Sequence, residues 1–453
     1  MGFNPLISCK FMKPKKPEKT PQDDLFRMRL DNLLDQRHEL YRLSSRLDWK
    51  AAEERFGALY SEEGRPGIPI RLMVGLHYLK HAFNESDETV VARWVENPYW
   101  QYFCGEEFFR HKLPIDPSQM TRFRKRIGEE GCEFMLGLTV KAGLDTGTVS
   151  RSSLEVVNVD TTVQEKAVAF PTDARLYHKA RAALVRQAKR HGIVLRQSFE
   201  RVSKHALAKS GRYAHASQMQ RSKREQKRLR TYLGRVLRDI ERKLPEAARK
   251  KMTRLIEVAW RIHGQQRHDK NKIYSVHAPE VECIAKGKSH KQYEFGVKVG
   301  VVSTSRESFV VGMKSLPGNP YDGHTLEASL DQTQKLTGVA VREAYVDRGY
   351  RGHGIQDAKV WIAGARRGVT VAIRKKLKRR NAVEPVIGHM KADGRLGRNF
   401  LKGVEGDAMN ALLCGAGHNL RKILRRLALF CARWMEMLLA VYRRLLFQHE
   451  ALT

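Results

Sequence analysis

Paired or clustered cysteines are missing from this sequence. Its six cysteines stand at positions 9, 104, 132, 283, 414 and 431, with no CxxC pair and no histidines at zinc-ligand spacing. This pattern excludes a small disulfide-stapled domain and a structural zinc site. It predicts reduced, buried thiols in a cytoplasmic protein.

A membrane-directing segment is also missing. Met1–Thr20 is basic and rich in proline and lysine, and it lacks the apolar run of a signal peptide. The most apolar late stretch, Leu427–Phe447, contains four charged residues, too many for a membrane-spanning helix. We therefore expect a flexible basic leader over residues 1–24, a packed helix near the C-terminus and no membrane partner.

Acidic residues are scarce relative to basic ones. The 453 residues include 49 aspartates and glutamates against 84 lysines and arginines, a net charge of +35. Because solubility does not require so large an excess, we expect a polyanionic partner, nucleic acid ahead of a membrane surface. The length allows two or three domains with a substantial core.

Residues 25–150 have a helical pattern, with leucines at three-to-four spacing from Leu30 onward. Asp116–Ser118 has the composition of a helix start, and four cations follow within five positions: Arg122, Arg124, Lys125 and Arg126. We interpret this segment as an all-α DNA-binding domain whose cations contact phosphates or a groove. The alternative is a solvated helix face in a structural bundle.

A second basic segment extends from about residue 175 to 265. It contains 26 lysines and arginines against six acidic residues, so it carries +20 of the net charge. Apolar residues at helical spacing, such as Leu229, Leu233 and Leu237, predict a helical insertion. We expect it to bind DNA through cations that include Lys223, Arg224, Lys227 and Arg228. The alternative is a soluble helix pair whose charges have no specific role.

Strand patterns lie on both sides of this insertion. Leu154–Val159 precedes it, and three strand-like runs follow it: Ala278–Ala285, Tyr293–Val301 and Phe309–Met313. A helix over Thr325–Leu336 and strands over Val339–Val346 and Lys359–Ala363 come next. This order predicts a ribonuclease H-like α/β domain over residues 151–405, with a mixed five-stranded sheet and flanking helices. Residues 406–453 then form C-terminal helices.

Three acids are placed to meet in this domain. Asp160 and Asp347 each follow a run of β-branched residues, and Glu384 comes 37 positions after Asp347. Pro385 places Glu384 at an irregular point unless a helix begins or kinks there. Carboxylates from separate elements can hold two divalent cations, so we predict a site for two Mg²⁺ ions, with Mn²⁺ as substitute. For either aspartate alone, a loop cap or a salt-bridge acid is the plainer interpretation.

Cations flank the third acid. Arg380 and Lys391 would lie on nearly the same helical face as Glu384, where they could hold a scissile phosphate. An exposed helix with ordinary charge pairing is the alternative. Arg348, directly after the second aspartate, could reach DNA or pair with Asp347.

Several segments spread over nearly the whole chain resemble the DDE transposases of bacterial insertion sequences. They are Gly67–Leu76, Val159–Lys166, Gly318–His324, Val346–Gly352 and Val383–Lys391. The resemblance is to the insertion-sequence-four and -five superfamily. Leu377 stands where the four-like signature has tyrosine, which favours the five-like group.

The resemblance implies that Asp160, Asp347 and Glu384 are the catalytic, metal-binding triad and that Arg380 and Lys391 are the basic residues of the signature. It further implies hydrolytic nicking at the inverted-repeat ends, which exposes 3′-OH groups, and attack of these groups on target DNA. The partners would be double-stranded DNA and a second copy of the chain in the DNA complex, at the bacterial nucleoid.

Two other functions fit the same residues. One is a catalytically silent DNA-binding protein derived from a transposase, which would bind terminal repeats without cutting them. The other is a nuclease of the same fold, which would cut DNA without joining strands.

Overall fold

The computed structural model describes residues 11–12, 28–61, 63, 65–285, 291–364 and 368–450, and the side chains of 11–12, 65–66 and 429–450 are outside this description. The leader expected over residues 1–24 therefore lies almost wholly outside the described residues. The chain forms two compact units. The larger takes the described residues within 1–164, 298–401 and 405–453, and the smaller takes those within 165–297 and 402–404.

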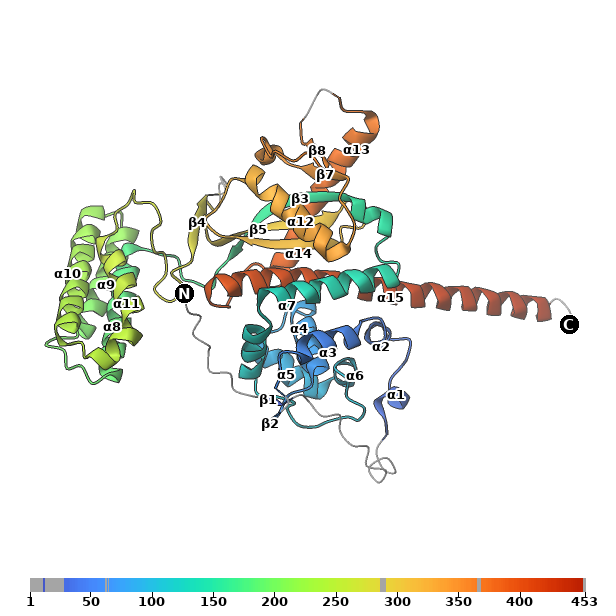
Figure 1. Cartoon of the computed structure of the whole chain (residues 1–453), viewed down its shortest axis with the longest axis horizontal. Helices are drawn as coiled ribbons and strands as arrows, with labels where there is room; N and C mark the ends of the chain where they lie inside the picture. The colour runs from blue at the N-terminus through green and yellow to red at the C-terminus, as the bar shows by residue number, and fades with distance from the viewer. Residues whose placement is uncertain are drawn as a thin grey trace. The chain divides into compact units, whose positions relative to one another are not determined.

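The N-terminal part of the larger unit is helical (Figure 1). Local capping sets several helix starts: Asp48, Ser86 and Asn97 each accept a backbone N–H at the first turn of a helix. The helices are α1 (Leu30–Leu33), α2 (Glu39–Ser44), α3 (Trp49–Gly57), α4 (Ile70–Ala82), α5 (Asp87–Glu96), α6 (Pro98–Phe103) and α7 (Ser118–Asp145). A short parallel pair joins β1 (Phe11–Met12) to β2 (Arg65–Pro66).

A mixed sheet forms the centre of the α/β part. Its strands are β3 (Val156–Glu165), β4 (Glu282–Ala285), β5 (Tyr293–Thr304), β6 (Val310–Leu316), β7 (Glu343–Val346) and β8 (Lys359–Ile362). The order is β4-β5-β3-β7-β8, with β6 also paired to β5. Strands β4 and β6 are antiparallel to β5, whereas β7 is parallel to both β3 and β8. This mixed α/β arrangement is compatible with a ribonuclease H-like fold.

The strand that contains Asp160 is longer than expected. We predicted that it ends at Val159, but β3 continues to Glu165. Thr161, Thr162 and Val163 extend the β-branched run, and such residues favour a strand. Asp160 therefore lies within the strand rather than after it.

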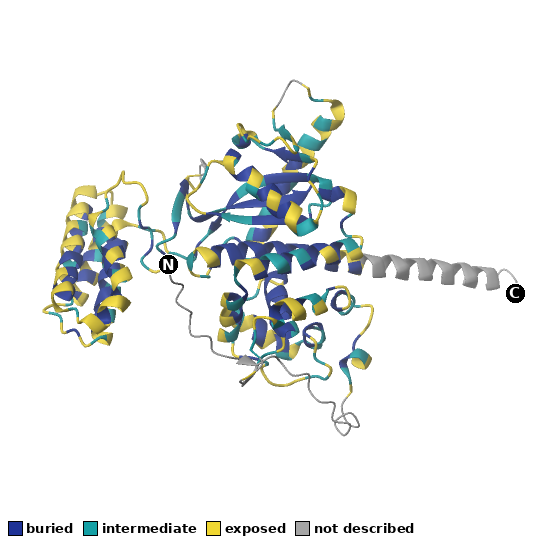
Figure 2. Cartoon of the chain, viewed as in Figure 1, coloured by how far each residue is buried: buried dark blue, intermediate teal, exposed yellow. Residues whose placement is uncertain are grey.

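Helices cover the sheet and connect it to the N-terminal helices (Figure 1). They are α12 (Leu326–Thr337), α13 (Val371–Arg379), α14 (Val383–Asp393) and α15 (Gly403–Glu450), and short 3₁₀ helices η2 (Arg151–Glu155), η3 (Asp322–Thr325), η4 (Arg348–Tyr350) and η5 (Arg380–Ala382) join the elements. Residues 406–420 of α15 are all buried (Figure 2). Gly415 permits this close packing, because a Cβ there would lie 2.8 Å from Met313 of β6 and 3.5 Å from Leu136 of α7.

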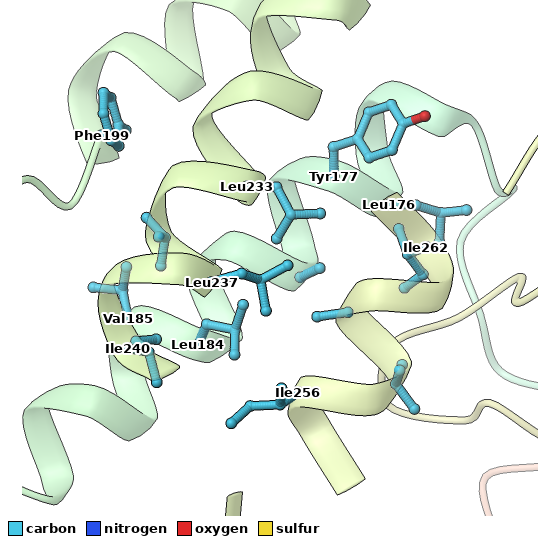
Figure 3. Packing of buried hydrophobic residues seen from close by; sticks show 14 of the residues in the cluster. Leu176, Tyr177, Leu184, Val185, Phe199, Leu233, Leu237, Ile240, Ile256 and Ile262 are labelled. Carbon is cyan, nitrogen blue, oxygen red and sulfur yellow. The ribbon is translucent and has the colours of Figure 1, made fainter. Parts of the chain in front are cut away.

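The smaller unit contains the basic insertion, which is a four-helix arrangement rather than a helix pair. Its helices are α8 (Asp173–Arg190), α9 (Glu200–His215), α10 (Met219–Lys243) and α11 (Glu246–Gly264). Apolar side chains such as Leu184, Leu233 and Ile256 form its core (Figure 3). The inward helix faces are buried and the outward faces exposed (Figure 2). The lysines and arginines of these helices are exposed, except Arg181, which is buried.

The predicted burial is confirmed for three of the four cysteines whose side chains are described, and Cys9 and the Cys431 side chain lie outside the described residues. Cys104, Cys132 and Cys414 are free and buried, and Cys283 is free and half-buried. Burial raises the pKa of the Cys132 and Cys414 thiols to about 12, which keeps them protonated and unreactive. No helix within the described residues is long and apolar enough to cross a membrane.

Two buried histidines are expected to make the free energy of unfolding depend on pH. Burial, together with the charges of the neighbouring Arg124 and Arg421, lowers the pKa of His77 and His418 to about 3. An unfolded histidine titrates near pH 6.5. Stability that is fully present above this pH should therefore be lost as pH falls towards 3, at about 1.4 kcal/mol per pH unit for each histidine.

Urea unfolding between pH 7 and pH 5 measures this loss. His418→Gln should reduce the slope, whereas the matched change at the exposed His324 should not. An unfolding free energy that stays constant from pH 7 to pH 5 would contradict the prediction.

Candidate active site

Strand register brings two of the predicted acids to the same level of the sheet. Asn158 of β3 lies opposite Tyr345 of β7 in a parallel pair. Asp160 and Asp347 are each two positions further along, so they reach the same level on the same face. Asp347 directly follows the end of β7, and its side chain caps η4 by accepting the Gly349 N–H at 2.9 Å.

Arg380 joins these two aspartates. Its Nη2 donates to Asp160 Oδ2 at 3.1 Å and lies 4.0 Å from Asp347 Oδ2. The Arg380 side chain is only 8% exposed, so the ion pair is largely shielded from water. The two carboxylates therefore share one buried positive group.

Glu384 lies one helical turn after Arg380. Helix α14 begins at Val383, so Pro385 falls within its first turn, where proline is tolerated because the N–H it lacks has no partner there. The Glu384 side chain is exposed and makes no ion pair with any residue that the structure describes. Within the described residues, no group of three or more His, Cys, Asp or Glu side chains is close enough to hold a metal ion.

The other cations predicted near the triad take separate positions. Arg348 is exposed beside Gly364, where a Cβ would meet its guanidinium at 2.7 Å, and no ion pair joins it to Asp347 within the described residues. Lys391 is half-buried in the last turn of α14.

A fourth carboxylate that the sequence analysis did not single out lies beside the two aspartates. Asp322 Oδ1 accepts hydrogen bonds from Lys298 Nζ at 3.0 Å and from Thr161 Oγ1 at 3.1 Å. Its Oδ2 lies 3.0 Å from the position that a Cβ on Gly349 would occupy. The segment Gly318–His324 was noted for its resemblance, but nothing local shows that Asp322 faces β3.

Tyr350 is buried among these acids. Its hydroxyl has no hydrogen-bond partner among the described residues, and the side chain is 1% exposed. Burial raises its pKa, and the charges of Asp160, Asp322 and Asp347 raise it further, so the hydroxyl remains a hydrogen-bond donor. An unpaired buried hydroxyl costs about 1–3 kcal/mol, which a bound partner would relieve.

One cation of the predicted DNA-binding run proves to be internal. Arg124 is 2% exposed and donates to both carboxylate oxygens of Asp87. The interpretation of Arg124 as a DNA contact is therefore not retained, because Phe123 and Ile127 turn this helix face inward. Arg122 and Lys125 are exposed, and Arg126 packs over the Tyr60 ring at 4.4 Å.

The insertion presents an arginine-rich face. Lys223, Arg224 and Lys227 are exposed on α10, and Arg228 pairs with Glu225 at 3.1 Å. Five of the seven arginines of α10 recur at helical spacing along one face, over about 27 Å at 1.5 Å per residue. They are Arg224, Arg228, Arg235, Arg238 and Arg242.

A cleft of about 610 Å³ lies at the C-terminal end of this face. Arg196, Arg235, Arg238 and Arg242 line it together with Asp239. Asp239 is already occupied, since it accepts the Arg196 N–H at 2.8 Å and pairs with Arg242 and Lys243. The guanidinium groups of Arg196, Arg235 and Arg238 have no acidic partner among the described residues.

Comparison with known proteins identifies the family. Residues 28–126 match a family model described as Transposase domain (DUF772). Over 207 residues the chain is 56% identical to the uncharacterized protein ORF8 in the nfe locus of Rhizobium meliloti, a match that covers 46% of this chain and all of that protein. The chain belongs to the same family as this protein, and the matched domain supports a transposase family. No solved structure matches the chain.

Proposed function

We propose that this protein is a DDE transposase of a bacterial insertion sequence, of the five-like group in the four and five superfamily. It binds the terminal inverted repeats of its element, nicks them to expose 3′-OH ends and joins these ends to target DNA. The observation that carries the proposal is the placement of Asp160 and Asp347 at one level of the sheet around Arg380, with Glu384 one turn further along.

The donor set of this site fits divalent cations. Asp160, Asp347 and Glu384 offer carboxylate oxygens, which Mg²⁺ and Mn²⁺ prefer, and the Arg380 guanidinium shows that the two aspartates accommodate a positive group between them. Two bound cations would neutralise charge on the scissile phosphate and favour ionisation of the attacking hydroxyl. Asp160, Asp347 and Glu384 would hold these ions.

The chain's own residues position the DNA. Arg380 and Lys391, which precede and follow Glu384, would hold the phosphate, and Arg348 would contact the strand beyond Asp347. Arg122, Lys125 and Arg126 at the start of α7 would contact the repeat, and the insertion would bind flanking or target DNA. We further propose a homodimer in the DNA complex and a cytoplasmic location on the nucleoid.

Labelled terminal-repeat DNA tests the proposal directly. Purified protein with Mg²⁺ or Mn²⁺ should release 3′-OH ends and join them to a second duplex. The repeat can be read from the DNA that flanks the gene, where short inverted repeats bounded by direct duplications are expected. Binding without cleavage would indicate a silent derivative, and cleavage without joining would indicate a nuclease.

The arginine cleft of the insertion gives a prediction about affinity. Arg196→Gln, Arg235→Gln and Arg238→Gln together should weaken duplex DNA binding by about 10–100-fold and reduce the slope of log K against log salt by about two to three, because each lost phosphate contact is worth about 0.9 in the slope. Fluorescence anisotropy at several salt concentrations measures both quantities.

A matched triple variant distinguishes the effect of the cleft arginines on DNA affinity from the effect of total charge. Lys250→Gln, Lys251→Gln and Arg254→Gln remove the same charge from exposed positions on α11. Equal losses in the two triple variants would show that affinity follows net charge and that the cleft has no special part.

A further inference from the structure

Asp322 lies beside the two residues, Thr161 and Gly349, whose backbone N–H groups donate to the candidate catalytic aspartates. On the β3 side, Thr161 Oγ1 donates to Asp322 Oδ1 at 3.1 Å, and the Thr161 N–H donates to Asp160 Oδ1 at 2.8 Å. Thr161 therefore binds Asp322 through its hydroxyl and Asp160 through its backbone N–H.

The β7 side has a parallel arrangement. The Gly349 N–H donates to Asp347 Oδ1 at 2.9 Å. A Cβ at Gly349 would lie 3.0 Å from Asp322 Oδ2 and 3.1 Å from Asp347 Oδ1, so any larger residue here would press on both carboxylates. Asp322 thus borders the residue that orients the second aspartate, just as it binds the residue that orients the first.

Lys298 fixes Asp322 in this position. Its Nζ donates to Asp322 Oδ1 at 3.0 Å and to the Pro320 carbonyl oxygen at 2.7 Å, and its side chain is 12% exposed. The pair offsets the charge of a carboxylate that would otherwise repel Asp347. Lys298 lies on β5, so the network connects β5, β3 and the end of β7.

An independent observation indicates that this cluster binds something. The Tyr350 hydroxyl is buried next to Asp160, Asp322 and Asp347 without a partner among the described residues. Buried polar groups are nearly always hydrogen-bonded in folded proteins. We therefore expect the Tyr350 hydroxyl to donate a hydrogen bond to a bound ligand or to a water molecule that the ligand binds.

We propose that Asp322 is a positioning residue, which orients Asp160 through Thr161 and borders Gly349 beside Asp347 so that the two aspartates can bind a divalent cation. This inference rests on the proposed function, because it concerns the same metal site. Outer residues that orient metal ligands contribute roughly 10–100-fold in metal affinity or activity.

Mn²⁺ titration of the full chain, followed by the EPR signal of the free ion, tests the proposal without requiring activity. Asp322→Asn should weaken Mn²⁺ binding by roughly 10–100-fold, and Thr161→Val by about tenfold. Thr161→Val removes one hydroxyl without changing any charge, so it separates positioning from simple electrostatic attraction. Thermal melting checks that each variant is folded.

Glu327→Gln is the matched control. It removes one negative charge from an exposed residue five positions after Asp322 and should leave Mn²⁺ affinity unchanged. Wild-type affinity in Thr161→Val would overturn the proposal, because Asp322 would then act through its charge alone. An equal loss in Glu327→Gln would overturn it as well.

Asp160→Asn and Asp347→Asn distinguish this failure from failure of the proposed function. If both variants bind Mn²⁺ as tightly as the wild-type chain does, the proposed metal site is wrong. If both do and Thr161→Val binds normally, the metal site stands and only the role of Asp322 is lost.

Discussion

Replacing Asp160 with asparagine is expected to reduce cleavage of terminal-repeat DNA by more than about a hundredfold while DNA affinity stays within a few-fold. Even residues that only orient a metal ligand are worth 10–100-fold, so loss of the ligand's charge should cost at least as much. Asparagine keeps the shape of the side chain and an oxygen that can accept the Thr161 N–H. Single-turnover cleavage with Mg²⁺ and anisotropy of the labelled repeat measure the two effects.

Asp331→Asn provides a control for charge alone. Asp331 is exposed on α12, so this change removes one negative charge from the same unit and should leave cleavage near the wild-type rate. Cleavage that persists in Asp160→Asn would remove this residue from the active site, and with it the central observation behind the proposed function.

Replacing Arg124 with methionine is expected to lower the free energy of unfolding by about 3 kcal/mol, the low end of the range for breaking a buried ion pair. Arg124 donates to Asp87 Oδ1 at 2.9 Å and to Oδ2 at 2.5 Å, and both side chains are largely buried. Lys80 Nζ also donates to Asp87, at 2.8 Å, and this bond should limit the loss in the variant. Urea unfolding followed by tryptophan fluorescence measures the change, because Trp94 and Trp100 are buried in the same set of helices.

The pKa of Lys80 gives a second measurement on this variant. Burial, together with the Arg124 charge, lowers it to about 8. Because methionine removes that charge, the pKa of Lys80 should rise towards its usual value. Arg122→Met, two residues earlier and exposed, should change stability by less than about 0.5 kcal/mol. Equal effects of the two changes would show that the Arg124 pair contributes nothing particular.

The amino-acid sequence by itself was sufficient for the type and order of the main elements. β-branched runs predicted the strands around Asp160 and Asp347, because such side chains pack well on a pleated surface. Leucines and valines at helical spacing predicted the insertion, since this spacing creates one apolar face. Both patterns arise from residues within a few positions of one another, so they can be recognised in the sequence alone. The charge excess also needed no structure to indicate a polyanionic partner.

Tertiary structure alone decided which charged residues meet. In the run Arg122 to Arg126 four cations look alike, but Arg124 points inward to Asp87, 37 positions away in the chain. Asp322 and Lys298 lie near Asp160 only because β5, β3 and β7 are neighbours in the sheet. The pattern within a strand fixes the face that each side chain takes, whereas the neighbours of the strand come from long-range pairing. No local pattern therefore indicates that Asp322 and Lys298 lie near Asp160.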